Sequence, residues 1–317
     1  MLNILWIVLG CIAGVLILFV LLTLICFVLV FYVPTRTQKQ LQKIKPTPGK
    51  IYKPYHDRFI ESIKLLRSMP CKQFEIISFD GLILRAKYYE TKKGAPIELM
   101  MHGYRGSAES DLCEGVQRCF KQNRNALLVD QRASRTSDGN IISFGVNEKQ
   151  DCKQWIDLLI KEFGPDVKII LTGISMGAAT VLLSAGDNLP DNVVGVIADC
   201  GYTSAEQIIK KVIKQLHLPV FIFYPLINLG AKVIGGFDLS QANVEQAVKN
   251  CKVPIAFFHG NNDGFVPVEM TKQNYQNCNA EKTILLVDGA DHGLSYVINP
   301  EQYLQMLSEF TKLCGIK

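Results

Sequence analysis

The pentapeptide Gly173-Ile174-Ser175-Met176-Gly177 has the pattern Gly-x-Ser-x-Gly, with a serine placed between two glycines. A serine hydroxyl becomes a useful nucleophile only when a base takes its proton and a rigid backbone presents it. A sharp turn brings the residues two before and two after the serine together, where glycine has no Cβ to clash. We therefore expect Ser175 to attack an acyl carbonyl.

The flanking residues favour such a turn. Residues 167–171 form an apolar run typical of a buried strand, and residues 178–183 have the composition of a helix start. A serine between a strand and a helix is the context that the pattern requires. The alternative is a chance match in a glycine-rich loop, and the flanking strand and helix count against it.

A serine nucleophile in this context needs an acid and then a histidine later in the chain. Beyond residue 248 the chain has two histidines, His259 and His292. His259 ends a predicted strand, and we expect it to be a hydrogen-bonding residue of a turn. His292 follows the last predicted strand, in a loop that can place its imidazole over the serine. We therefore predict His292 as the general base.

The acid has several candidates. Asp263 lies in a loop after a predicted strand, before a Val-Pro pair that starts a helix, and we predict it as the acid. Asp199, at the end of an earlier strand, is the other plausible choice. Asp288 and Asp291 lie near His292 in sequence, and we expect Asp291 to face solvent.

An acyl-transfer site also needs donors for the oxyanion. We expect one from the backbone N–H of Met176, directly after the nucleophile, and one from the loop of residues 102–106 after the third strand. Its glycines allow the backbone to turn inward, and Tyr104 N–H is the predicted second donor. We expect the His102 side chain to brace this loop.

Past residue 70, strand-like and helix-like segments alternate. The expected strands are 73–79, 82–89, 97–101, 126–130, 167–171, 193–199, 253–259 and 283–287, and the clearest helices are 107–121, 147–163 and 300–313. Asp80-Gly81 predicts a tight hairpin turn between the first two strands. The alternation predicts an α/β fold, with a mostly parallel sheet and helices on both faces.

Residues between Asp199 and Cys251 contain no convincing strand and many Ile, Leu, Val and Phe. An insertion here would lie over the carboxyl ends of the strands, where ligands bind in open α/β sheets. We predict a helical lid at about residues 203–248 that lines an apolar pocket. The alternative is ordinary packing of apolar helices against the core.

Residues 1–33 are predicted to form a transmembrane anchor, because residues 4–33 are almost entirely apolar and uncharged. A cleaved export signal is the alternative, but no basic start or small-residue cleavage site is evident. Residues 34–69 are expected to form a basic, proline-containing linker and a leading helix, and residues 70–317 the catalytic domain. The linker's lysines and arginines predict a cytoplasmic domain on a single-pass cell-membrane protein.

Charge and cysteines narrow the function further. The net charge is only +5 and the basic residues cluster beside the span, so no nucleic-acid binding is expected. The ten cysteines lie scattered, without zinc-like spacing, and they fit a reducing compartment. We expect no metal and no cofactor.

The combined motifs resemble the α/β-hydrolase superfamily over about residues 70–313. More narrowly, they are similar to membrane-anchored bacterial hydrolases of the Firmicutes, of the esterase and serine aminopeptidase-like group. The resemblance rests on the serine turn and on the segments 102–106, 259–267 and 291–293. It implies an α/β-hydrolase fold with a lid and a triad of Ser175, Asp263 and His292.

One segment departs from the resemblance. Such proteins usually have Arg-Gly-His-Gly-x-Ser after the fourth strand, whereas residues 132–137 here are Arg-Ala-Ser-Arg-Thr-Ser. We expect this loop to border the pocket and to alter substrate preference.

The predicted activity is hydrolysis of esters or thioesters of small or lipid-like acyl substrates through an acyl-enzyme on Ser175. A serine peptidase of the same fold and a non-catalytic, membrane-tethered binding protein are the alternatives. No acidic cluster suited to a substrate amino terminus is evident, which favours esters.

Overall fold

The computed structural model describes residues 2–316 and contains one eight-stranded sheet in the order β1-β2-β4-β3-β5-β6-β7-β8. The strands are β1 (Lys72–Ile77), β2 (Ile83–Tyr89), β3 (Ile97–Met101), β4 (Asn125–Asp130), β5 (Ile169–Ile174), β6 (Val193–Asp199), β7 (Ile255–Gly260) and β8 (Lys282–Val287). β2 pairs antiparallel with β1 and β4, and the pairings from β4 to β8 are all parallel. The predicted α/β sheet and its first hairpin are confirmed.

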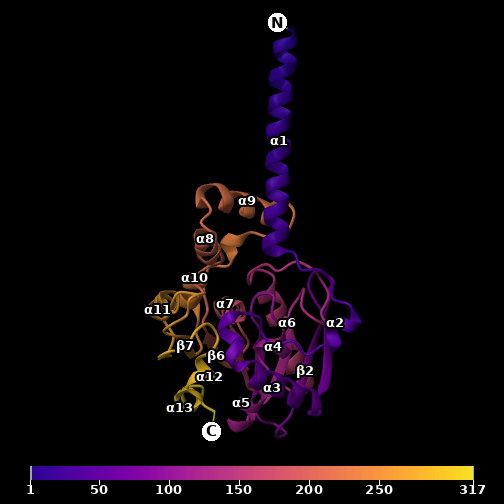
Figure 1. The fold of residues 1–317 in the computed structure, drawn as a ribbon. Helices are drawn as coiled ribbons and strands as arrows, with labels where there is room; N and C mark the ends of the chain where they lie inside the picture. The colour runs from indigo at the N-terminus through magenta and orange to yellow at the C-terminus, as the bar shows by residue number, and fades with distance from the viewer. Residues whose placement is uncertain (1, 317) are drawn as a thin grey trace.

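Helices cover both faces of this sheet (Figure 1). They are α1 (Leu2–Phe31), α2 (Gln38–Gln42), η1 (Lys50–Tyr55), α3 (His56–Ser68), α4 (Ala108–Asp111), α5 (Gly115–Lys121), α6 (Glu148–Phe163), α7 (Met176–Ala185), α8 (Ala205–Gln215), α9 (Val220–Val233), η2 (Leu239–Gln241), α10 (Val244–Asn250), α11 (Val268–Asn277), α12 (Ser295–Ile298) and α13 (Pro300–Leu313). Successive side chains of a strand point to opposite faces. Leu99 and Met101 therefore join the core beneath α6, α7 and α10, whereas Met100 joins the core beneath α4 and α5.

The helix expected at residues 107–121 is two helices, α4 and α5. Ser107 caps α4 by accepting a hydrogen bond from Ser110 N–H at 3.0 Å. The chain then turns at Leu112 before α5 begins at Gly115, where an added Cβ would lie 2.6 Å from Met100 Cε. The break places Gly115 against the tip of the Met100 side chain, while α5 itself packs on β4.

The N-terminal helix α1 projects from the body as a long shaft (Figure 1), and residues 4–31 are long and apolar enough to cross a membrane. Its last turn is fixed to the domain. Phe31 is fully buried against Phe144 and Phe237, and Phe31 O accepts a hydrogen bond from Ile142 N–H at 2.9 Å. The end of the predicted span is therefore part of the folded domain.

A buried charge cluster joins the two strands that lead into the site. Glu98 on β3 is fully buried, pairs with Arg118 at 2.5 Å and Arg124 at 2.6 Å, and accepts a hydrogen bond from Thr172 of β5 at 3.0 Å. Burial alone would raise the pKa of Glu98, but the two guanidinium groups outweigh it and lower the pKa to about 2. The carboxylate thus stays charged and links β3 to β5.

Replacing Glu98 with Gln should lower the free energy of unfolding by about 3–5 kcal/mol, because two arginines then remain buried without a counter-charge. Glu75→Gln is the matched control: its carboxylate pairs with Arg85 at the surface, and its loss should cost no more than about 1 kcal/mol. Urea unfolding of the full chain in detergent measures both values. Equal effects of the two substitutions would contradict the structural role of the cluster.

Candidate active site

Ser175 lies in the sharp turn between β5 and α7. Its backbone has φ 56° and ψ −117°, a conformation that residues with a Cβ rarely adopt. A Cβ on Gly173 would lie 2.2 Å from the carbonyl of Gly177, and one on Gly177 would lie 2.1 Å from Met101 O. Both glycines are therefore required by close backbone contacts, as the pentapeptide predicted.

Loops from three different strands meet at this turn. His292, in the loop after β8, places Nε2 at 2.9 Å from Ser175 Oγ. Its Nδ1 lies 2.7 Å from Oδ2 of Asp263, which follows β7. Because parallel strands end at the same edge of the sheet, residues 117 positions apart come into hydrogen-bond contact there. The structure brings together the three residues predicted as nucleophile, base and acid.

The Asp263 side chain is fully buried and well supplied with donors. Its Oδ1 accepts hydrogen bonds from the backbone N–H groups of Phe265 and Val266, each at 2.8 Å. Burial alone would raise the pKa of Asp263, but hydrogen bonds from His259 and His292 outweigh it and hold the pKa well below its usual range. Asp263 is therefore a carboxylate at neutral pH.

His259 contributes more than its position in a turn indicates. It is completely buried, and its Nε2 lies 3.0 Å from both Asp263 Oδ2 and Val266 O. Its Nδ1 lies 2.7 Å from Thr271 Oγ1. Asp263 thus stands between two imidazoles, a contact that sequence analysis missed. The sequence did contain a signal for this contact: His259, at the end of a predicted strand, lies four residues before Asp263.

The other acids serve different contacts. Asp199 accepts a hydrogen bond from Ser295 Oγ at 3.2 Å, and burial raises the pKa of Asp199. Asp291 accepts hydrogen bonds from the N–H groups of His292, at 2.7 Å, and Gly264, and so joins the two loops. Asp288 accepts a hydrogen bond from Asn261. Asp263 alone among these candidates contacts the His292 ring within the described residues.

Tyr104, which carries one of the two expected oxyanion donors, lines the same cavities as Ser175, and Met176, which carries the other, follows Ser175 directly. Within residues 2–316, neither Tyr104 N–H nor Met176 N–H donates a hydrogen bond, so both are available to a ligand. The loop that holds Tyr104 is anchored by Gly103 N–H, which donates to Asp111 Oδ2 at 3.0 Å. His102 Nε2 accepts from Gln131 N–H at 3.1 Å, which agrees with the expected bracing role.

A buried cysteine lies beside the histidine and the acid. The potential ligand atoms of Cys200, Asp263 and His292 lie within 4.8 Å of one another. Burial raises the pKa of Cys200 well above its usual value, whereas metal ligation requires a thiolate. Asp263 and His292 are also hydrogen-bonded to each other. The arrangement fits a proton-transfer site better than a metal site.

Two cavities contain Ser175. One, of about 350 Å³, is lined by apolar side chains of α1, α8 and α9 together with Tyr104 and Met176. The other, of about 370 Å³, is lined by residues 47–59, the loop after β3, and His292. Helices from the predicted lid therefore line one wall of the site, whereas α10 packs against α7.

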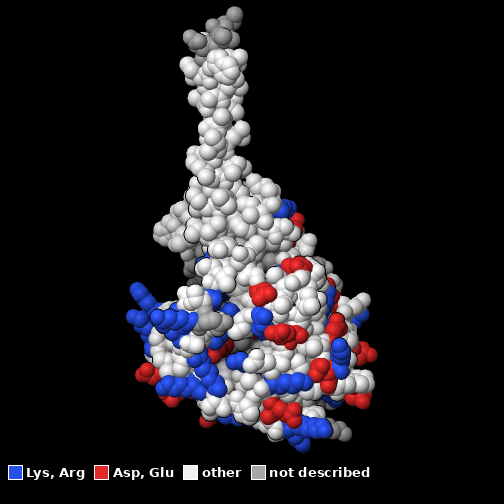
Figure 2. Space-filling view, turned by 90° about the vertical axis from the view of Figure 1, so that its right-hand side faces the viewer, with Lys and Arg blue, Asp and Glu red and all other residues white. Residues whose placement is uncertain are grey.

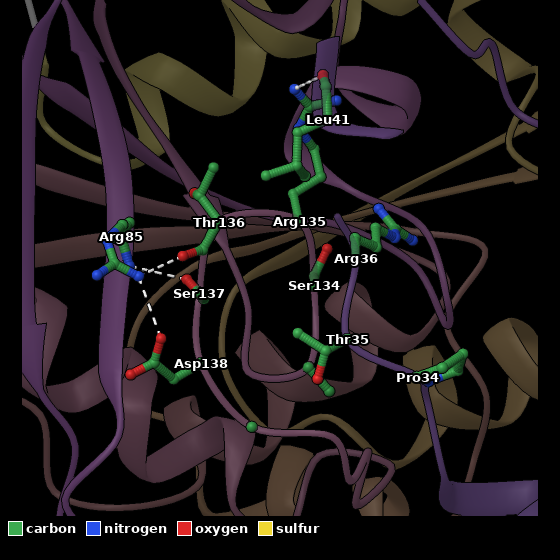
Figure 3. A pocket seen from close by; sticks show the side chains of 12 residues that line it. Pro34, Thr35, Arg36, Leu41, Arg85, Ser134, Arg135, Thr136, Ser137 and Asp138 are labelled. Carbon is green, nitrogen blue, oxygen red and sulfur yellow. Dashed lines mark hydrogen bonds and ion pairs between the residues drawn. The ribbon is translucent and has the colours of Figure 1, made fainter. Parts of the chain in front are cut away.

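The unusual loop at residues 132–137 lies elsewhere. Its residues line a separate cavity of about 610 Å³ with Arg85 and residues 34–36 of the linker (Figure 3). Neither cavity at Ser175 includes this loop, so the expectation that it borders the substrate pocket is wrong. The reason is Arg132, whose buried guanidinium pairs with Asp80 at 2.9 Å and Asp151 at 2.7 Å and turns the loop toward β2.

No protein-family model matches the chain. The uncharacterised protein YqkD of Bacillus subtilis is 28% identical over 187 residues, which cover 59% of this chain and 61% of YqkD. The chain thus matches less than two thirds of the length of this curated relative.

Several solved structures have the same architecture. The esterase Pf2001 of Pyrococcus furiosus has a TM-score of 0.64 and 21% identity, over 89% of this chain and 97% of its own. The α/β hydrolase GrgF of a Penicillium species has a TM-score of 0.60 and 15% identity, over 78% and 100%. The acylaminoacyl peptidase of Pyrococcus horikoshii has a TM-score of 0.56 and 16% identity, over 78% and 43%. The chain therefore has the α/β-hydrolase fold.

Asp263→Asn should reduce kcat far more than Asp199→Asn, by up to about 10⁴-fold, because an amide cannot hold the imidazole in its working tautomer. Asp199 is the matched control, since it is a buried acid at the end of β6 that hydrogen-bonds to Ser295 and not to the His292 ring. Steady-state hydrolysis of an activated ester measures the effect, and circular dichroism confirms folding. A larger loss in Asp199→Asn would transfer the role of acid to that residue.

Proposed function

We propose that this α/β-hydrolase-fold chain is a membrane-anchored serine hydrolase that cleaves carboxylic esters or thioesters. The observation that supports it most is the continuous hydrogen-bonded series from Asp263 through His292 to Ser175. A strained serine turn, free N–H groups beside the nucleophile and an adjoining apolar cavity agree with this proposal.

The proposed reaction begins when Ser175 Oγ attacks the acyl carbonyl and His292 Nε2 takes the hydroxyl proton. The oxyanion of the tetrahedral intermediate accepts hydrogen bonds from Tyr104 N–H and Met176 N–H, each worth about 3 kcal/mol. As the intermediate collapses, the C–O or C–S bond breaks, and the departing oxygen or sulfur takes the proton from His292 and leaves as an alcohol or thiol. Water, activated by the same imidazole, then attacks the acyl-enzyme and releases the carboxylic acid.

The acidic residues around the site favour ester substrates over peptides, because none of the described ones lining the cavities is free to bind a substrate amino group. Apart from the triad, an aminopeptidase would need a carboxylate free to bind a substrate amino group. Among the described residues that line the two cavities at Ser175, Asp111 is the one acidic side chain. Its oxygens already accept hydrogen bonds from Gly103 N–H and Thr47 Oγ1.

Ser175→Ala should abolish hydrolysis of p-nitrophenyl acetate and labelling by a fluorophosphonate probe while leaving the fold intact. The surface variant Ser240→Ala is the control, and it should keep the parent rate and full labelling. Rate assays and gel fluorescence of the probe measure both. A scaffold or binding protein would leave the parent chain unlabelled, and parent-like turnover in Ser175→Ala would exclude this nucleophile.

The domain is proposed to face the cytoplasm, with α1 retained as a single span. Six basic residues follow the span: Arg36, Lys39, Lys43, Lys45, Lys50 and Lys53. Such an excess keeps a segment on the cytoplasmic side.

Protease added to intact spheroplasts should therefore leave the domain undigested, because the membrane shields it. Lysed spheroplasts are the control, in which the same protease should degrade it. Immunoblotting with a C-terminal tag follows both samples. Digestion from outside, or release of a form that begins near Thr35, would refute the cytoplasmic location and leave the hydrolase proposal intact.

A further inference from the structure

Two cavities meet at Ser175, and the proposed general base, His292, lines only one of them. His292 lines the cavity bordered by residues 47–59 and does not line the apolar cavity under α8 and α9. The imidazolium must hand its proton to the departing oxygen or sulfur, so the leaving group has to lie on the side of His292. This requirement places the acyl chain in the apolar cavity.

We propose that α1 itself forms a wall of the acyl-chain site, which takes a long acyl chain directly from the lipid bilayer. The inference deepens the proposed function and rests on it. Five residues of α1 line the apolar cavity: Leu22, Ile25, Cys26, Leu29 and Val30. Relative to Leu22 the others lie three, four, seven and eight residues later, so they occupy one face of the helix.

The opposite wall comes from the inserted helices. Ile209 and Val212 line the cavity from α8, and Leu216 lines it directly after the end of that helix. Ile227 lines it from α9, which packs along α1. The lining is almost wholly apolar, and its volume of about 350 Å³ lies within the range of small-molecule sites, about 300–1,000 Å³. A hydrocarbon chain fits this lining, whereas a charged or strongly hydrated acyl group does not.

The position along α1 at which burial begins fits the thickness of a bilayer. Side chains 4–21 are all exposed, and burial against the domain starts at Leu22. At 1.5 Å per residue, the exposed stretch 4–21 rises about 27 Å, close to the hydrocarbon core of a membrane, which is about 30 Å thick. The apolar cavity therefore begins where the lipid ends.

The surface around the cavity is suited to lipid contact. Leu216, Phe221 and Val233, at the ends of α8 and α9, are 63%, 80% and 73% exposed. In Figure 2 the uncharged surface of the α1 shaft continues onto the adjoining part of the body, and charged atoms gather farther from the shaft. An acyl chain can pass from the bilayer to Ser175 between α1 and this apolar surface.

Hydrogen bonds hold the α1 wall in register with the oxyanion loop. Tyr104 Oη donates to Val30 O at 2.6 Å, and Arg105 Nη2 donates to Leu29 O at 2.8 Å and Tyr32 O at 3.0 Å. The guanidinium thus binds free carbonyls at the negative end of the helix. The loop that supplies the second oxyanion donor is consequently anchored to the membrane helix.

The test uses the full chain in lipid nanodiscs and compares p-nitrophenyl laurate with p-nitrophenyl acetate. Ile25→Trp and Val212→Trp fill the cavity from its two walls. Leu24→Trp is the matched control, because Leu24 is about as exposed as Ile25 (45% against 52%) but lines neither cavity at Ser175. We expect the laurate-to-acetate ratio of kcat/KM to fall at least tenfold in both wall variants and to stay unchanged in the control. A parent-like ratio in the wall variants, or an equal fall in the control, would overturn the inference.

A second measurement needs no substitution. A dodecylphosphonofluoridate, with a photoreactive diazirine at the chain end, is attached to Ser175 of the unaltered chain and irradiated. Crosslinks to residues 22–30 or to α8, located by mass spectrometry, are expected. Crosslinks confined to residues 47–59 would reverse the assignment of the two cavities. Absence of any label on Ser175 would instead refute the proposed function.

Discussion

The close contact between Gly173, Gly177 and the end of β3 is the constraint on which the rest of the site depends. It allows α7 to start directly after β5 and holds Ser175 at a positive φ, and Met176 N–H, next in the chain, donates no hydrogen bond within residues 2–316. β3 and β5 must keep their relative position for this contact to persist, and the buried Glu98 cluster joins these two strands. The charges inside the core and the geometry of the serine turn are therefore parts of one arrangement.

Several hydrogen-bond donors fix the carboxylate of Asp263 at the same time. Asp263 contacts two imidazoles and accepts two backbone N–H bonds, so its charge is stabilised by four donors in a fully buried position. Because His259 is itself fixed by Thr271 on α11, the packing of that helix is coupled to the orientation of the His292 ring. A buried carboxylate fixed in this way needs little reorganisation when the imidazolium forms.

Local sequence patterns were sufficient for the serine turn, because its requirements lie within a strand, five residues and a helix. Asp263 and His292 could also be predicted, since each follows a strand whose carboxyl end must reach the same edge. Three features could not be predicted from local patterns: the second imidazole at Asp263, the break at Gly115 and the position of the loop after Arg132. Each depends on a partner distant in sequence or across the sheet: Oδ2 of the acid, Met100 on β3, or Asp80 and Asp151. The contribution of α1 to the apolar cavity could not be predicted either. Hydropathy shows that a leucine prefers an apolar environment, but it does not show whether lipid or protein provides it.

The fixed junction at the end of α1 also determines how the domain is oriented relative to a membrane. Phe31 packs between aromatic rings, and Tyr104 and Arg105 bind carbonyls of the last turn of α1. These contacts prevent rotation of the domain relative to α1. With α1 in a bilayer, the domain would keep one height and one tilt above the lipid headgroups. Encounters with substrate would then occur by lateral diffusion in two dimensions, and their frequency would depend on the mole fraction of substrate in the leaflet rather than on its concentration in water.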